Sequence, residues 1–180
     1  MLEPLPPEVR ELLDTLNAPP RLIAHLRLVH HVAFEVTTML DRTWPGLPYD
    51  RQAVLVGAAT HDIGKIVHRH ELSEPGRQHE DRGVTLLRQH GFSEEQARFA
   101  RTHGQWESDP ATMLEDLLVA LADTIWKGQR DENLERVLAL HVAALQCQEP
   151  WAIYLALDDL IQPITQGADA RLLWHTQHPL

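Results

Sequence analysis

The chain has 180 residues, of which 43% are hydrophobic and 23% charged, and these values are ordinary for a soluble globular domain with a sizeable core. Its 26 acidic residues outnumber its 16 basic ones, which gives a formal net charge of −10. This balance excludes an extended nucleic-acid groove, because a phosphate backbone needs a broad basic field. A local cationic site for a small phosphate ester is still compatible with it.

The sequence contains one cysteine, Cys147, so neither an internal disulfide nor a thiolate metal cluster is expected. The first residues show no basic segment followed by an apolar one, and the longest apolar run, residues 53–59, is far shorter than a membrane span. We therefore expect a cytoplasmic protein that has no membrane partner.

The spacing of the apolar residues predicts an all-α fold, because they recur at the helical period and no strand-like alternation competes with it. We expect a single domain over residues 1–180. In chain order, helices are expected at 8–16, from Pro20 to the break at Trp44-Pro45, from Asp50 to about 60, and at 79–90, 93–103, 110–127, 134–145, 151–161 and 168–174, with a loop over 67–78.

Several helix ends carry a recognisable signal. Asp50 is a plausible N-cap for the third helix, whose residues 53–59 are small and apolar on every side. Neighbouring elements are therefore expected to bury this helix all round. Gly91 is expected to end the following helix, and Ser93 with Gln96 forms a capping box at the start of the next one.

The helix expected over residues 110–127 is central, because leucine and isoleucine form a stripe along it and further apolar residues extend around its side. Asp123 lies about half a turn from that stripe, where its carboxylate is poorly solvated. Burying a carboxylate is costly unless it is paired or bound to a metal. The alternative interpretation is an i,i+4 ion pair with Lys127.

Histidine is the compositional outlier: the chain has 12, and nine of them lie between His25 and His103. Neutral imidazole is the commonest protein ligand for transition metals, so this crowding favours a metal site. Outside the crowded region, His175 and His178 are interpreted as a polar tail. The last three helices carry no ligand set and are interpreted as packing surface, with a possible homodimer contact.

Adjacent imidazole and carboxylate groups at the end of a buried helix are well placed to hold a divalent metal, and His61 and Asp62 have this arrangement. Other residues of ligand type precede and follow this pair in segments predicted to be helical. These candidate ligands are His25, His30, His79, His103 and Asp123.

Four segments carry a family resemblance. They are His61-Asp62-Ile63-Gly64-Lys65, Ala122-Asp123, the His-x-x-x-Gly-x-x-Leu-Leu pattern from His79 to Leu87, and Thr102-His103-Gly104. With them the chain resembles the HD-domain superfamily of metal-dependent phosphohydrolases over residues 20–130, and residues 131–180 would be a C-terminal helical extension. In layout it is most similar to two-metal bacterial members that split dinucleoside tetraphosphates symmetrically.

The resemblance implies an HD-domain helical bundle and two divalent transition-metal ions, each Mn, Fe, Co, Ni or Zn. One ion would take the first histidine, His61, Asp62 and Asp123. The second would take His79 and His103, with Asp62 bridging the two. A nitrogen-rich ligand set of this kind does not favour magnesium or calcium.

The identity of the first histidine is open between two positions in the long helix. His25 gives a family-like His-x-x-x-Val pattern with Val29, whereas His30 gives the more usual spacing to His61. We favour His30 slightly, keep His25 as nearly equal, and interpret His31 as solvated.

The expected chemistry is attack by metal-activated water, with Asp62 and Lys65 as catalytic residues and Lys65 neutralising charge on the phosphoryl group. Arg69, Arg77 and Lys127 are further candidates for phosphate contacts, although each is also compatible with an ordinary surface role. Asp116 lies one heptad before Asp123, and it could replace Asp123 or brace a ligand.

We therefore expect a phosphohydrolase that acts on a phosphate ester or anhydride of a small nucleotide-like substrate. Two other classes fit the same residues. One is a non-catalytic, metal-bound module that senses a nucleotide, and the other is a di-iron oxygenase on the same helical scaffold.

Overall fold

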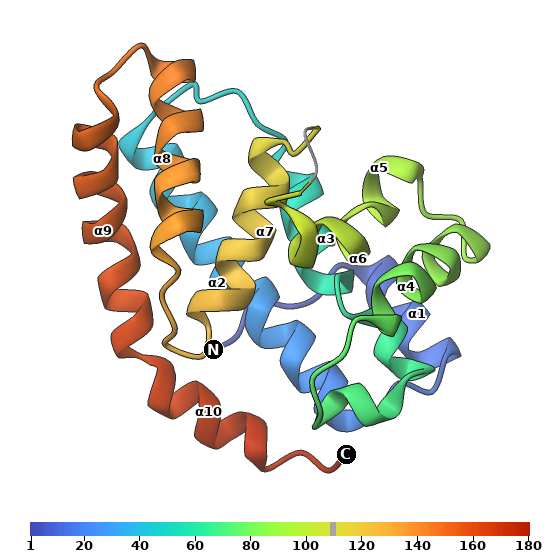
Figure 1. The fold of residues 1–180 in the computed structure, drawn as a ribbon. Coiled ribbons are helices and arrows are strands. Elements are labelled where there is room, and N and C mark those ends of the chain that lie inside the picture. Colours follow the sequence, from blue (N-terminus) through green and yellow to red (C-terminus); the bar gives the residue numbers. More distant parts are fainter. Residues whose placement is uncertain (109–110) are drawn as a thin grey trace.

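The computed structural model describes residues 1–108 and 111–180, and within these residues the chain is helical and forms no strand (Figure 1). The helices are α1 (Pro7–Thr15), α2 (Pro20–Thr43), α3 (Arg51–Thr60), α4 (Gln78–Gln89), α5 (Glu94–Ala97), α6 (Phe99–Gln105), α7 (Leu114–Ile125), α8 (Glu132–Gln146), α9 (Pro150–Gln166) and α10 (Ala168–Thr176). Two short 3₁₀ helices, η1 (Ile63–Ile66) and η2 (Arg69–Leu72), follow α3. The all-α prediction is confirmed.

The predicted helix ends are also confirmed where a capping signal exists. The Asp50 side chain accepts a hydrogen bond from the Ala53 N–H at 3.0 Å. Ser93 and Gln96 form both hydrogen bonds of a capping box. Gly91 follows α4 with a φ of +86°, a conformation that glycine adopts without strain.

Other boundaries differ from the prediction. The central helix α7 begins at Leu114, because the Asp116 carboxylate caps it by accepting the Met113 N–H at 2.9 Å; the predicted start at Pro110 lies outside the described residues. The helix expected at 93–103 is divided at Arg98 into α5 and α6, and η2 occupies part of the expected loop. Helix α9 continues past Pro163, because Ile164, the next residue, is buried in the core.

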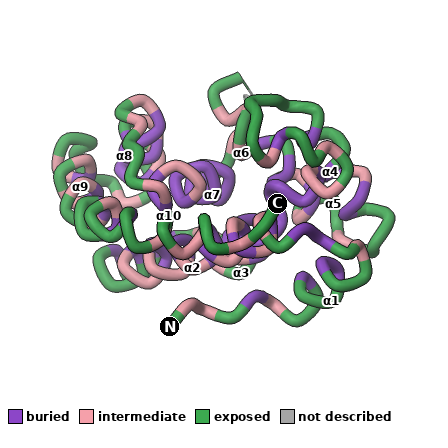
Figure 2. The backbone as a smooth tube through the Cα atoms, turned by 90° about the horizontal axis from the view of Figure 1, so that it is seen from below, coloured by how far each residue is buried: buried purple, intermediate pink, exposed green. Residues whose placement is uncertain are grey.

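The apolar core consists of two clusters that meet along α3. One joins the second half of α2 to α7, α8 and α9, and includes Val54 and Ala58 of α3. The other joins α1, the first half of α2, α4 and the α5–α6 region, and includes Ala59 and Ile63. The second half of α3 is therefore buried all round, as predicted, and Figure 2 shows buried segments where α2, α3 and α7 meet.

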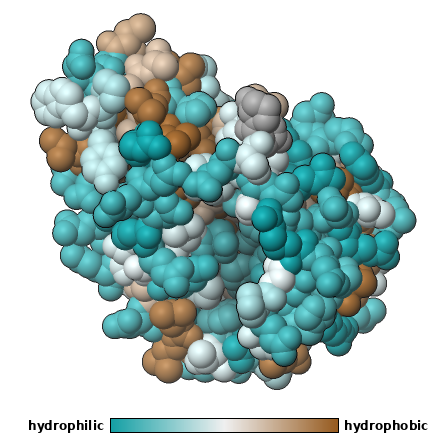
Figure 3. Space-filling view, viewed as in Figure 1, coloured by the Kyte–Doolittle hydropathy of each residue, from teal (hydrophilic) through white to brown (hydrophobic). Residues whose placement is uncertain are grey.

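The C-terminal helices lie on one side of this arrangement. Helices α8 and α9 pack against each other beside α7, and exposed hydrophobic residues gather over them in the upper left of Figure 3. Helix α10 then runs toward the start of α2, where the Arg21 N–H donates to the Pro179 carbonyl at 2.9 Å. None of the helices in the described residues combines the length and apolarity that a membrane crossing requires.

Two glycines allow the segment after α3 to lie directly against α4. A Cβ atom on Gly64 would stand 1.9 Å from the His79 carbonyl oxygen, and one on Gly83 would stand 2.9 Å from the Ala100 Cβ. No side chain fits at either position without moving the backbone or α6. The close approach places Asp62 and His79, which lie on either side of this contact, within reach of each other.

Gly64→Ala should lower the free energy of unfolding by about 3 kcal/mol or more, at the upper end of overpacking effects, because its Cβ meets backbone atoms that have no space to yield. Chemical denaturation measures this change. Gly46→Ala is the matched control: Gly46 has a φ of +88° and nothing within 4 Å of an added Cβ, so it should lose only about 1 kcal/mol through backbone strain. Equal losses in the two variants would contradict the packing account.

Candidate metal centre

Three elements bring four potential ligands together where the two core clusters meet. His25 comes from α2, His61 and Asp62 from the end of α3, and Asp123 from the last turn of α7. The His25 Nε2 atom lies 3.0 Å from Asp62 Oδ2, 3.2 Å from His61 Nε2 and 3.4 Å from Asp123 Oδ1. His61 Nε2 lies 3.5 Å from Asp123 Oδ1. Asp123 therefore lies against His25 and His61, and the alternative interpretation, an ion pair with Lys127, does not account for its position.

A second group forms on the other oxygen of Asp62. The Oδ1 atom lies 3.0 Å from His79 Nε2, on α4, and 3.7 Å from His103 Nε2, on α6. The potential ligand atoms within each group lie within 4.8 Å of one another. The first group is His25, His61 and Asp62, and the second is Asp62, His79 and His103. Asp62 is therefore shared between two adjacent groups that could each hold a metal ion.

Hydrogen bonds at Nδ1 orient three of the imidazoles. His61 Nδ1 lies 3.0 Å from the Ala58 carbonyl, His103 Nδ1 lies 3.0 Å from the Phe99 carbonyl, and His79 Nδ1 lies 2.5 Å from Glu71 Oε2. Each partner is an acceptor, so Nδ1 carries a proton. In the neutral imidazole that binds a metal, the lone pair is then on Nε2, which faces Asp62. Metal-ligating histidines are held in this manner.

The surroundings of His79 Nε2 indicate that a metal ion fits beside Asp62. His79 Nε2 is buried and has no partner in hydrogen-bond geometry, although it lies close to Asp62 Oδ1. With Nδ1–H donated to Glu71, Nε2 offers a lone pair to a carboxylate, and two acceptors cannot form a hydrogen bond with each other. A cation between them would satisfy both atoms.

The electrostatics keep Asp62, Asp123 and His103 in the protonation states that metal binding needs, whereas at His61 and His79 the charge of Asp62 outweighs burial and raises the pKa of the imidazole. Burial raises the pKa of Asp62, but the charges of His61 and Lys65 outweigh burial and hold that pKa well below its ordinary value. Burial likewise opposes ionisation of Asp123, and its contacts with His61 reverse the effect and lower the pKa. Burial lowers the pKa of His103 to about 4, so its imidazole is neutral at neutral pH.

The slight preference for His30 over His25 is corrected by the structure. His30 Nδ1 lies 3.0 Å from the Leu55 carbonyl and His30 Nε2 lies 3.2 Å from the Pro4 carbonyl, so both nitrogens face backbone oxygens away from the cluster. Five residues along a helix rotate a side chain by about 140° relative to His25, which faces Asp62. His31 is partly buried and accepts the Glu3 N–H at 3.2 Å.

The predicted phosphate-binding cations separate into two pairs. Lys65 Nζ lies 2.6 Å from Asp62 Oδ2, and Lys127 lines the cavity in front of the cluster. Arg69 is exposed and does not line that cavity, and Arg77 is exposed and pairs with Glu80 at 2.9 Å. The structure therefore brings the two lysines to the site and leaves the two arginines outside it.

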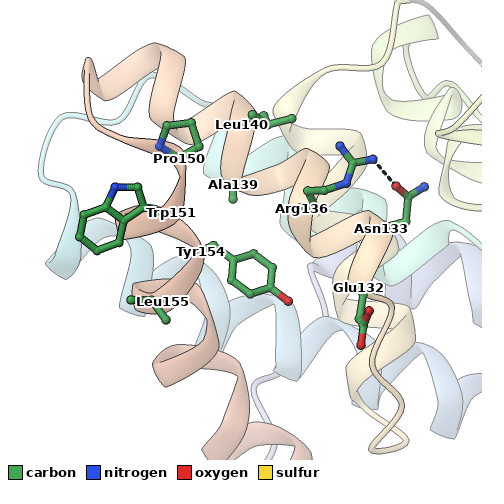
Figure 4. Close-up of a pocket in the computed structure, with 9 residues that line it drawn as sticks. All are labelled: Glu132, Asn133, Arg136, Ala139, Leu140, Pro150, Trp151, Tyr154 and Leu155. Carbon is green, nitrogen blue, oxygen red and sulfur yellow. Dashed lines mark hydrogen bonds between the residues drawn. The ribbon is translucent and has the colours of Figure 1, made fainter.

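The cavity in front of the cluster has a volume of about 200 Å³ and is open to solvent. Its lining residues come from α2, α3, η1, η2, α7 and α10: Arg21, His25, Asp62, Lys65, Leu72, Asp123, Trp126, Lys127 and His175. The only two lysines of the chain are both among them. A larger cavity of about 730 Å³ lies between α8 and α9 and is bordered by Trp151 and Tyr154 (Figure 4). Neither of the potential metal-ligand groups found among the described residues lies in its lining.

Sequence reasoning missed several residues of the site. Glu71 is buried and accepts hydrogen bonds from His79, but it lies in a segment predicted to be a loop, with no periodic signal. The interpretation of His175 as part of a polar tail is wrong, because it lines the cavity, and burial lowers its pKa to about 4. Asp116 does not replace Asp123: it accepts hydrogen bonds from Arg98 and Thr102.

Comparison with known families agrees with this geometry. A family model described as HD domain matches residues 21–125, more than half of the chain. The chain belongs to the HD-domain family. The match spans the clustered residues from His25 to Asp123 and ends before α10. Searches of curated proteins and of solved structures found no match.

Glu71→Gln should weaken metal binding by about 10- to 100-fold, the usual effect of removing a group that orients a ligating histidine. The amide leaves a polar side chain in place but removes the charge that holds the Nδ1 proton of His79. Titration of the metal-free protein with Zn²⁺ against a competing chelator measures the change. Glu74→Gln, an exposed position on the same segment, should leave affinity unaltered; equal affinity of both variants would contradict this role of Glu71.

Proposed function

We propose that this HD-domain protein is a metal-dependent phosphohydrolase that cleaves a phosphate ester or anhydride in a small nucleotide-like substrate. The observation that carries the proposal is the sharing of Asp62 between two groups of potential metal ligands, beside a cavity that holds both lysines of the chain. Paired metal positions with nearby cations are suited to phosphoryl transfer to water.

His25, His61, Asp62 and Asp123 would hold one ion, and Asp62, His79 and His103 the other. Imidazole nitrogens mixed with carboxylate oxygens suit Mn, Fe, Co, Ni or Zn. When bound, two such ions supply Lewis acidity, which polarises a phosphoryl group and makes water a competent nucleophile near neutral pH.

The protein's own residues bind and orient the anionic substrate. Lys65 and Lys127 place positive charge around a cavity that also contains two carboxylates. A volume of about 200 Å³ is below the range of pockets that enclose a drug-sized ligand, about 300 to 1,000 Å³. The phosphoryl end would therefore enter, while the rest of the substrate lies across the opening. The lysines favour an anionic substrate.

Asp62→Ala should abolish metal binding and hydrolysis together, because it removes the carboxylate common to both ligand groups. Elemental analysis and a turnover screen with phosphodiesters and nucleotides in the presence of Mn²⁺ measure the two properties. Asp81→Ala, at a carboxylate exposed on α4 and paired with Arg101, should change neither. Full metal content in the Asp62→Ala protein would show that the site is assigned wrongly.

Lys65→Met should retain the metals and lower the rate by about 100-fold, the effect of losing one well-placed electrostatic donor. The matched control is Arg69→Met, which removes a nearby cation that does not line the cavity. We expect water to attack phosphorus directly, because the lone cysteine, Cys147, is exposed and does not line the cavity. Hydrolysis in ¹⁸O water should then place one label in the phosphate product while no phospho-enzyme can be trapped. A trapped phospho-enzyme would contradict direct attack by water, and an unaltered Lys65→Met rate would exclude the lysine.

A further inference from the structure

Helix α10 lies against the metal cavity, and the side chains of two arginines attach it there. Arg171 donates from Nε to the Trp126 carbonyl at 2.7 Å and also contacts the Ile125 carbonyl, so it caps the end of α7. Arg21 of α2 donates from Nε to the His178 carbonyl at 2.6 Å. His175 lies between these two attachments, one helical turn after Arg171 and on the same face of α10.

Three buried side-chain polar atoms in the described residues have no hydrogen-bond partner, and all three belong to residues around the metal centre. They are His79 Nε2, Trp126 Nε1 and His175 Nε2. The Trp126 and His175 rings lie 5.2 Å apart between centroids, and each also lies beside the ring of His25. Trp126 and His175 line the metal cavity, whereas His79 does not. Because buried polar atoms are almost always hydrogen-bonded in native proteins, Trp126 Nε1 and His175 Nε2 point to a ligand atom as their partner.

The chemistry of Trp126 defines that partner. The residue is only 5% exposed, and an indole N–H is a donor that cannot accept, so its partner must carry an acceptor atom. An imidazole Nε2 can donate to the same kind of atom. Lys65 and Lys127 line the same cavity, and their charges favour an anionic oxygen over a neutral one.

We propose that Trp126 and His175 bind a phosphate oxygen of the substrate on the side of the metal cavity formed by α7 and α10. The inference rests on the proposed function, and it makes the C-terminal helix part of the active site. It also places a substrate contact outside the segment that matches the HD-domain model, which ends at residue 125.

The test uses inorganic phosphate as the probe and the full chain loaded with Zn²⁺. In protein labelled with ¹⁵N at the tryptophan indoles, phosphate should shift the Trp126 N–H resonance, which the Trp126→Phe variant identifies. His175→Ala and Trp126→Phe should each weaken phosphate binding by about tenfold, the loss for one hydrogen bond to a charged group, at unchanged zinc content. His175→Gln, which keeps a polar donor, should lose less.

Two control variants are matched by position and type. His178→Ala changes the next histidine on the C-terminal segment, and Trp151→Phe changes an exposed tryptophan of α9; both should bind phosphate as the wild type does. Unaltered phosphate affinity in His175→Ala, or an unmoved Trp126 resonance at saturating phosphate, would overturn the subsite while leaving hydrolysis by the metal centre intact. Phosphate binding with the expected shift but no turnover of any phosphate ester would retain the subsite and remove the proposed function.

Discussion

Asp62 is only 2% exposed, and its two carboxylate oxygens face different partners. His25 and Lys65 contact Oδ2, and His79 contacts Oδ1. A buried carboxylate is strongly destabilising without compensation, so the fold must deliver positive or hydrogen-bonding groups from both sides. His25 of α2 and Lys65 of η1 supply such groups at Oδ2, and at Oδ1 a cation held between Asp62 and His79 of α4 would supply the charge. The meeting of the two core clusters at α3 brings these elements together.

The packing of η1, α4 and α6 around Asp62 depends on residues that are not potential ligands. Gly64 allows η1 to lie against the backbone of α4, and Glu71 holds the ring of His79 from behind. On the far side, Asp116 hydrogen-bonds Thr102, the residue before His103, and so fixes α6 to α7. The positions of the ligands are therefore set by backbone contact and by the hydrogen bonds behind the imidazoles. A substitution at Gly64, Glu71 or Asp116 should alter the metal centre although none of these residues is a potential ligand.

Sequence patterns predicted the parts of this arrangement that local chemistry determines. Helical spacing, the Asp50 cap and the adjacent His61 and Asp62 follow from short-range rules. Short-range rules could not decide between His25 and His30, because both lie near the apolar face of one helix. Only the packing of α3 and the N-terminal segment decides which of them reaches Asp62. His175 was missed for a related reason: nothing near it in the sequence indicates that the end of the chain returns to α2.

The most direct test of the central claim, that Asp62 is shared by two metal positions, is anomalous X-ray diffraction from crystals of the Mn²⁺-loaded protein, measured at the manganese edge. The account predicts two anomalous peaks, one on each side of the Asp62 carboxylate. One peak would lie beside His25, His61 and Asp123, and the other beside His79 and His103. A single peak, or peaks remote from Asp62, would contradict it.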